Sequence, residues 1–169
     1  IAISSNGYLL TSYHVVKGSH NISICNETDT INRYNVDLVY HNSVTDIAVL
    51  KVSDTTFSSF GRLPVFFSKN PVDLGEYVFT LGYSKKDIVF GEGSVASLSG
   101  FEEDSLTYQV SVPANPGNSG GPIINNNGEL IGLLCARNID REGAAFAIKS
   151  LYITSVIDSL TNDTTLEKP

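Results

Sequence analysis

Short apolar runs separated by polar, glycine-containing turns dominate the chain. Two of the turns read Asn-Gly, at Asn6-Gly7 and Asn127-Gly128, and each lies between two apolar runs. This is the strongest short-range signal for a β-hairpin, and it predicts a positive φ at both turn residues. Further strand-length segments recur at roughly the 8–12-residue spacing of a sandwich or barrel, at 22–25, 36–40, 47–52, 77–81, 88–98, 106–112 and 144–148. The pattern predicts an all-β fold.

One segment near the end of the chain has helical periodicity. Ser150 can cap a helix whose apolar residues, at positions 151, 153, 156, 157 and 160, share one face. The loop-rich stretch 53–75 contains two prolines and is typical of a connection between two β units. We therefore expect an N-terminal β unit at 1–62, a connection at 63–76, a second β unit at 77–149, a helix at 150–160 and a polar tail at 161–169.

Composition and charge narrow the range of partners. The 169 residues are 41% hydrophobic and 17% charged, which is typical of a folded globular chain and excludes disorder or a coiled coil. The net charge is −7 and no run of Lys or Arg occurs, so we expect neither nucleic acid nor an anionic membrane surface as a partner. The apolar runs are far shorter than the ~20 residues of a membrane span. Because the chain begins with Ile1 and enters a hairpin directly, we expect it to be a fragment of a longer protein.

The cysteines and histidines give no metal-binding motif. Cys25 and Cys135 lie far apart, and His14, His20 and His41 are scattered without the spacing of metal ligands, so we expect no metal site. The two cysteines can form one disulfide. Because both lie in apolar, strand-like runs, two buried thiols are the favoured alternative.

A glycine-rich loop surrounds one serine at Ser119. The segment 116–122 reads Pro-Gly-Asn-Ser-Gly-Gly-Pro and directly precedes a strand. Glycines let such a loop turn tightly, and they can direct the N–H groups of Gly117 and Ser119 at one point beside the serine hydroxyl. This arrangement would combine a nucleophile with an oxyanion hole. The alternative is a glycine-rich turn with an inert serine.

A nucleophilic serine needs a base, and the base needs an acid that fixes its tautomer. His14 ends the apolar run that begins at Tyr8, and Asp46 opens the strand that follows it. Each residue alone is more often structural, the histidine in a strand and the aspartate as a turn or cap residue. Together with Ser119 they form a His-Asp-Ser set, two members on the first β unit and one on the second, so that a cleft between the units can hold all three.

Four segments carry a resemblance to a known family. They are Asn6 to Val16, Asp46 to Lys51, Gly117 to Pro122, and Gly128 to Gly132 followed by Ala145 to Ile148. In this order they resemble the chymotrypsin-fold serine peptidases, specifically the HtrA/Deg-like branch, over about residues 1 to 160. The resemblance implies a chymotrypsin-like double antiparallel β-barrel with a C-terminal helix, whose first barrel is incomplete at its N-terminus.

The resemblance also implies the roles of the site residues. His14 would be the general base and then the acid, Asp46 its orienting partner, Ser119 the acylated nucleophile, and the N–H groups of Gly117 and Ser119 the oxyanion hole. The substrate-binding residues would be Pro113, Ala114, Asn115, Pro116, Cys135, Ala136, Arg137, Gly143 and Ala145.

The same positions predict the side chain accepted before the scissile bond. Pro113 forms the expected base of the pocket, and without an acid there a buried Lys or Arg side chain would lack a partner. Arg137 would narrow the entrance and favour small or aliphatic residues. Its guanidinium group can instead attract an acidic side chain.

The sequence therefore predicts a serine endopeptidase that acts on peptide or protein substrates and needs no cofactor. An inactive homologue that binds peptides or unfolded chains is the main alternative, and a serine esterase or a purely structural β domain is a third. The resemblance favours an extracytoplasmic location, periplasmic or secreted. An oligomer is compatible with the sequence, but no feature of it supports one.

Overall fold

The computed structural model describes residues 1–27, 31–135 and 145–163, with side chains up to residue 160. The N-terminal part forms a four-stranded antiparallel sheet. Its spatial order is β1-β4-β3-β2, with β1 (Tyr8–Ser12), β2 (Ile22–Cys25), β3 (Arg33–Asn42) and β4 (Ile47–Val52).

The C-terminal part forms a seven-stranded sheet in the order β11-β8-β7-β6-β9-β10-β5. A further antiparallel pairing between β10 and β11 closes six of these strands into a barrel, and β5 adds to β10 in parallel. The strands are β5 (Phe66–Phe67), β6 (Tyr77–Gly82), β7 (Val89–Ser97), β8 (Thr107–Val110), β9 (Pro122–Asn125), β10 (Glu129–Cys135) and β11 (Ala145–Lys149).

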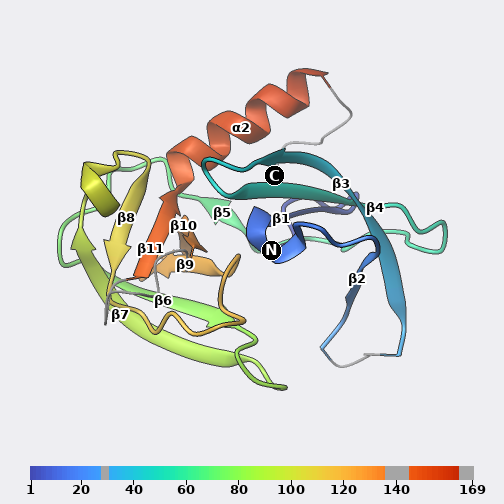
Figure 1. Cartoon of the computed structure of the whole chain (residues 1–169), viewed down its shortest axis with the longest axis horizontal. Coiled ribbons are helices and arrows are strands. Elements are labelled where there is room, and N and C mark those ends of the chain that lie inside the picture. Colours follow the sequence, from blue (N-terminus) through green and yellow to red (C-terminus); the bar gives the residue numbers. More distant parts are fainter. Residues whose placement is uncertain (28–30, 136–144, 164–169) are drawn as a thin grey trace.

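Helical segments connect and cover the two sheets. A single turn, α1 (Tyr13–Val16), follows β1, a 3₁₀ turn, η1 (Phe101–Glu103), precedes β8, and α2 (Ser150–Asp163) follows β11. The sheets lie side by side and α2 runs across one edge of the molecule above both of them (Figure 1). Among the described residues, no helix is both long and apolar enough to span a membrane.

Three clusters of buried side chains hold these elements together. One lies inside the first sheet and one inside the second barrel. The third joins them, because it packs Leu10 and Val49 of the first sheet against Leu133 and Ile148 of the second and against Ile153 of α2. The two sheets therefore meet through a shared apolar layer, on which any site between them rests.

The structure confirms the all-β fold with two barrel-like sheets and a C-terminal helix. The strands expected at 22–25 and 47–52 have the same bounds in the structure, and the other expected strands differ by a few residues at their ends. The strand expected at 144–148 is described from Ala145 onward, since residue 144 lies outside the described part. The expected connection at 63–76 contains the short strand β5.

The Asn127-Gly128 turn connects the antiparallel strands β9 and β10, whereas the segment before Asn6-Gly7 pairs with β1 only through an isolated antiparallel bridge between Ala2 and Leu9. In both turns the predicted backbone is wrong at the asparagine. Gly7 and Gly128 have φ values of 100° and 77°, whereas Asn6 and Asn127 are not among the residues with positive φ. The loops are wider than two residues, and each closes with a hydrogen bond from the glycine N–H to the carbonyl three residues earlier. In such loops only the last residue must be left-handed, which is the usual place of glycine.

The two cysteines are not joined by a disulfide. Cys135 is buried, as the sequence favoured, but Cys25 is exposed, so the expectation of two buried thiols is wrong for Cys25. The reason is the position of Cys25 at the end of β2, an edge strand whose side chains alternate between partial burial and exposure.

Truncating Ile153 should destabilise the fold, because its fully buried side chain packs in the layer between the sheets. We expect Ile153→Ala to lower the free energy of unfolding by about 2–5 kcal/mol, measured by urea denaturation. Leu151→Ala is the matched control, because Leu151 lies on the same helix and is 51% exposed. It should change stability by no more than about 0.5 kcal/mol. Equal losses in the two variants would contradict the packing described for α2.

Candidate active site

The carboxylate of Asp46 is the buried centre of the site. Asp46 lies in the turn between β3 and β4, immediately before β4, and only 1% of it is exposed. Its φ of 59° is in the left-handed region, which Asp tolerates better than most residues. Its backbone carbonyl accepts a hydrogen bond of 2.9 Å from the N–H of Tyr13. The turn is thus fixed directly against the start of α1.

His14 makes two hydrogen bonds to this carboxylate. Its ring Nδ1 lies 2.6 Å from Oδ2 of Asp46, and its backbone N–H donates to Oδ1 at 2.9 Å. A carboxylate can only accept, so Nδ1 carries the proton and Nε2 is left as a proton acceptor. The sequence placed His14 at the end of an apolar strand, which is wrong: β1 ends at Ser12 and His14 lies in α1. That turn is what brings both its N–H and its ring to Asp46.

The thiol of Cys135 is a third donor to Asp46, and the sequence did not indicate it. Cys135 ends β10, and its Sγ lies 3.0 Å from Oδ2 of Asp46. The two residues are 89 positions apart, so no local pattern could reveal the contact. The resemblance assigned Cys135 to the substrate pocket, but its thiol faces the acid of the expected triad.

The loop that contains Ser119 is held tightly against both sheets. Gly117 has a φ of 98°, and a Cβ there would collide with the backbone of Tyr83, directly after β6. Gly120 has a φ of 78°, and a Cβ there would collide with Thr11 at the end of β1. Only glycine fits at either position. The loop therefore lies within contact distance of the strand that leads into His14.

Two backbone N–H groups of this loop donate no hydrogen bond within the part of the chain that the structure describes. Those of Asn118, Gly120 and Gly121 donate within the protein, to the carbonyls of Asn115, Leu134 and Asn118, at 3.0, 2.8 and 2.9 Å. Those of Gly117 and Ser119 donate to nothing in the described part of the chain. Within the same part, no hydrogen bond joins Ser119 to His14.

The buried side chain of Asn118 ties the loop to the preceding segment and to β6. It is 1% exposed, and its Nδ2 donates to the carbonyl of Pro113 at 3.1 Å. The Cα and side chain of Asn118 also lie so close to Gly82 that a Cβ on Gly82 would collide with them. The segment before the serine is therefore tied to β6 as well as to the loop itself.

The residues expected to bind substrate are spread over different environments. Pro113, Asn115 and Pro116 are exposed. Ala114 packs partly buried against the core of the second barrel, and Ala145 is buried within that core. The expected residues Ala136, Arg137 and Gly143 lie outside the described residues.

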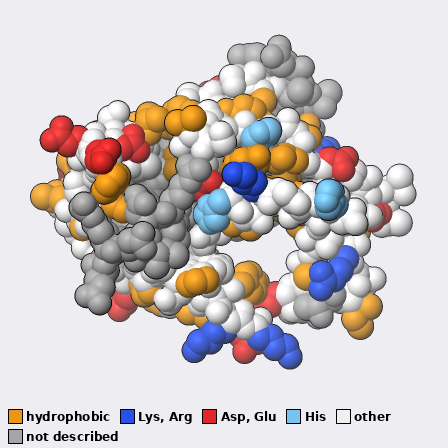
Figure 2. Space-filling view, in the orientation of Figure 1, with side chains coloured by type: hydrophobic (Ala, Val, Ile, Leu, Met, Phe, Trp, Pro, Cys, Tyr) orange, Lys and Arg blue, Asp and Glu red, His pale blue; other side chains and the backbone are white. Residues whose placement is uncertain are grey.

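The surface on this side of the molecule is hollowed between the two sheets, with histidine side chains at and near the rim of the hollow (Figure 2). Lys and Arg side chains are scattered over this face and do not gather into a patch (Figure 2).

Comparisons with known proteins agree with this arrangement. The chain is 29% identical over 182 residues to "Serine protease Do-like HtrA" of Bacillus subtilis, covering 98% of this chain and 39% of that protein. It is 32% identical over 181 residues to "Probable periplasmic serine endoprotease DegP-like" of Rhizobium meliloti, covering 98% of this chain and 33% of that protein. The chain thus spans less than half the length of either relative.

A solved structure has the same fold. The crystal structure of the serine endoprotease from Yersinia pestis superposes with a TM-score of 0.77 at 26% identity, over 96% of this chain and 57% of that one. This match confirms the chymotrypsin-like double β-barrel with a C-terminal helix. The trypsin-like peptidase domain family matches residues 1–133, most of the sequence. The chain therefore belongs to the trypsin-like peptidase domain family, and its relatives are of the HtrA/DegP kind.

Proposed function

We propose that this chain is a serine endopeptidase domain that hydrolyses peptide bonds through an acyl-enzyme on Ser119. The observation that carries the proposal is the contact between His14 and Asp46. The buried carboxylate holds both the ring and the backbone of His14, at 2.6 and 2.9 Å, which fixes the orientation and the tautomer of the imidazole. A histidine that serves only to pack a strand has no need of this arrangement.

In the first chemical step, the Oγ of Ser119 attacks the scissile carbonyl carbon while Nε2 of His14 takes the hydroxyl proton. The imidazolium that forms is stabilised by Asp46, which remains ionised and keeps its bond to Nδ1–H. His14 then gives the proton to the leaving amine. In the second step water attacks the acyl-enzyme, with His14 again taking and returning a proton, so that Ser119 is regenerated.

The two unused N–H groups in the serine loop support an oxyanion hole. The carbonyl oxygen becomes negatively charged in the tetrahedral intermediate and needs preorganised donors. The N–H groups of Gly117 and Ser119 have no partner in the described part of the chain, and the loop that carries them is held by Asn118 and by close contacts at Gly117 and Gly120. Donors held in this way need little rearrangement when the negative charge develops on the carbonyl oxygen.

The absence of a hydrogen bond between Ser119 and His14 in the described structure does not argue against catalysis. In resting enzymes, catalytic hydrogen bonds are often long and tighten only when substrate binds. The Ser119 loop already contacts the end of β1, a few residues before His14.

We further propose that the substrates are peptides or unfolded protein segments with small or aliphatic residues before the scissile bond. The support is the segment from Pro113 to Pro116, which offers no acidic group to a Lys or Arg side chain. No cofactor is needed for this mechanism. The relative from Rhizobium meliloti is named as periplasmic, which supports an extracytoplasmic location for this chain as well.

Labelling with a fluorophosphonate probe tests the nucleophile and its base. The Oγ of Ser119 should displace fluoride at phosphorus, so that the intact chain gains the mass of one probe less HF. Ser119→Ala should give no adduct, and His14→Ala should label at least about 10³-fold more slowly because the serine loses its base. His20→Ala is the matched control, since His20 is exposed and lies outside the site, and it should label as the unchanged protein does.

An adduct that persists in Ser119→Ala would falsify the assignment of the nucleophile. A folded protein that gives no adduct would favour the alternative of an inactive homologue that binds peptides.

Substituting Gly117 should separate loop geometry from overall stability. In Gly117→Ala the new Cβ must displace the loop from Tyr83, and the loss of one oxyanion donor lowers acylation by about 10²–10³-fold. Gly128→Ala is the control: its φ of 77° imposes similar backbone strain, of about 1–2 kcal/mol, but nothing lies within 4 Å of the added Cβ. We expect Gly128→Ala to lose stability but to keep the labelling rate of the unchanged protein. Equal labelling rates in both variants would argue against the oxyanion role.

A set of peptides that differ only before the scissile bond tests the predicted specificity. With Ala, Val, Leu, Glu and Lys at that position, we expect the highest kcat/KM for Ala, Val or Leu. The Lys peptide should be cleaved at least about 10-fold less efficiently, because its charge would be buried without a partner. A preference for Lys would show that the proposed pocket base is wrong, and a preference for Glu would support an attractive role for Arg137.

A further inference from the structure

The fold places a soft metal ligand beside two members of the proposed triad. Nδ1 of His14, a carboxylate oxygen of Asp46 and Sγ of Cys135 all lie within 4.8 Å of one another. Imidazole nitrogen, carboxylate oxygen and thiolate sulfur are the three ligand types that bind zinc in proteins, and a thiolate selects zinc over magnesium or calcium. The expectation of no metal site rested on spacing in the sequence, and spacing cannot detect a set drawn from positions 14, 46 and 135.

The distances between these atoms suit a metal after a small rearrangement. Oδ2 of Asp46 lies 2.6 Å from Nδ1 and 3.0 Å from Sγ, and each of these short contacts is bridged by a proton. Ligand atoms around a tetrahedral zinc ion lie about 3.4–3.6 Å apart, given zinc–ligand bonds of about 2.0–2.3 Å. Each of these two contacts must therefore lengthen by less than about 1 Å. Nδ1 and Sγ, which lie within 4.8 Å of each other, must approach by no more than about 1.4 Å.

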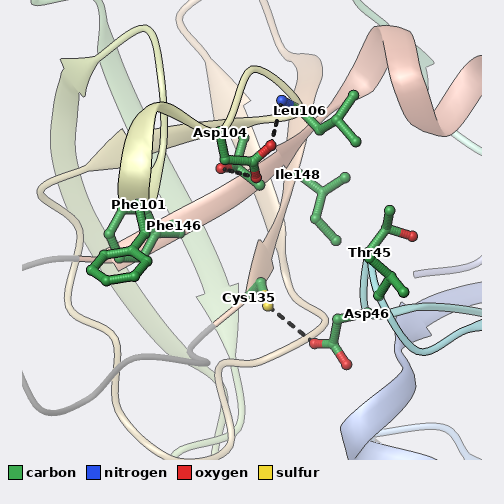
Figure 3. Close-up of a pocket in the computed structure, with 10 residues that line it drawn as sticks. Thr45, Asp46, Phe101, Asp104, Leu106, Cys135, Phe146 and Ile148 are labelled. Atoms are coloured by element: carbon green, nitrogen blue, oxygen red, sulfur yellow. Dashed lines mark hydrogen bonds between the residues drawn. The ribbon is translucent and has the colours of Figure 1, made fainter.

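A pocket gives a cation access to the set from the side of Cys135. It has a volume of about 230 Å³, and Asp46 and Cys135 lie together at one end of it (Figure 3). A second carboxylate, that of Asp104, also lines this pocket and accepts hydrogen bonds from Leu106 and Thr107. None of the ten described residues that line the pocket is Lys or Arg, so its charge attracts cations.

We propose that one Zn²⁺ binds to Nδ1 of His14, Asp46 and Sγ of Cys135, and that its binding switches the peptidase off. Binding releases the thiol proton to solvent and moves the ring proton of His14 from Nδ1 to Nε2. The ring stays neutral, but its Nε2 can no longer take the proton of Ser119. The inhibitory part rests on the proposed function, whereas the binding of the metal does not.

Cobalt substitution tests the metal site without any need for activity. In Cys25→Ser, Cys135 is the only thiol left, so a thiolate-to-cobalt charge-transfer band on adding Co²⁺ can come from Cys135 alone. We expect this band at one equivalent of Co²⁺ and its loss when Zn²⁺ displaces the cobalt. Absence of the band in the folded variant would overturn the proposal. Cys25→Ser keeps Cys135 and its buried contact with Asp46, so this contact still supports the fold of the variant.

Zinc titration of the fluorophosphonate reaction then tests the inhibition. Zn²⁺ should slow labelling of Cys25→Ser, and EDTA should restore it. The matched variant Cys25→Ser/Cys135→Ser keeps a hydrogen-bond donor beside Asp46 but loses the soft ligand. It should need at least about 10-fold more Zn²⁺ for the same inhibition, since losing even an outer partner of a metal ligand costs about 10–100-fold in affinity.

The outcomes separate the two proposals. Equal zinc sensitivity in the two variants would overturn the role of Cys135. A cobalt band in a protein that never labels would leave the metal site standing while contradicting the peptidase function. A cobalt band together with labelling that Zn²⁺ does not slow would overturn the switch.

Discussion

The buried carboxylate of Asp46 is the constraint on which the rest of the site depends. A carboxylate that is 1% exposed is costly to ionise unless donors surround it. Here three donors do so, the backbone and ring N–H groups of His14 and the thiol of Cys135, at 2.9, 2.6 and 3.0 Å. Two of them come from the first sheet's side and one from the second. The full set of these contacts to Asp46 therefore forms only when both sheets are in place.

The apolar layer beneath the site holds the two sheets in the relative position that these contacts need. Leu10 and Val49 pack against Leu133 and Ile148 across the junction of the sheets, and Ile153 of α2 closes the layer from outside. The polar contacts above it run along the same junction: Ser12 donates to the carbonyl of Leu134, and Gly120 donates to the same carbonyl. The distance between the two halves of the site is thus set by packing, and hydrogen bonds select the side-chain orientations.

Much of the fold followed from local sequence patterns, because strands and hairpins are encoded locally. The segments 22–25 and 47–52 have the predicted bounds, and the Asn127-Gly128 turn connects the expected strands. The run before Asn6-Gly7 forms only an isolated bridge, between Ala2 and Leu9. The short helical turn at His14 was missed, since four residues are too few to show a helical period. The strand β5 was also missed. Its two residues are too few to show an alternating pattern, and they pair only with β10, which is distant in the sequence.

The contacts of the site were predictable only in part. Motif order placed His14, Asp46 and Ser119 together as a set, and the structure joins the first two directly. The sequence motifs could not predict that Asp46 would adopt a φ of 59°, because that conformation is imposed by the turn and by the hydrogen bond from Tyr13. Nor could it predict the contact with Cys135, which the fold alone creates across 89 positions.

The thiol of Cys135 beside Asp46 has two opposite chemical properties, as a hydrogen-bond donor and as a metal ligand. A thiol is a weak hydrogen-bond donor, so it adds little to the stabilisation that the two N–H groups of His14 already provide. As a thiolate, however, it is among the strongest ligands for soft divalent metals. A hydroxyl in the same place would complete the carboxylate's hydrogen bonds without attracting such metals. Of the three donors, the thiol therefore adds least to the hydrogen bonding of Asp46, and it is the group that a soft metal ion would bind most strongly.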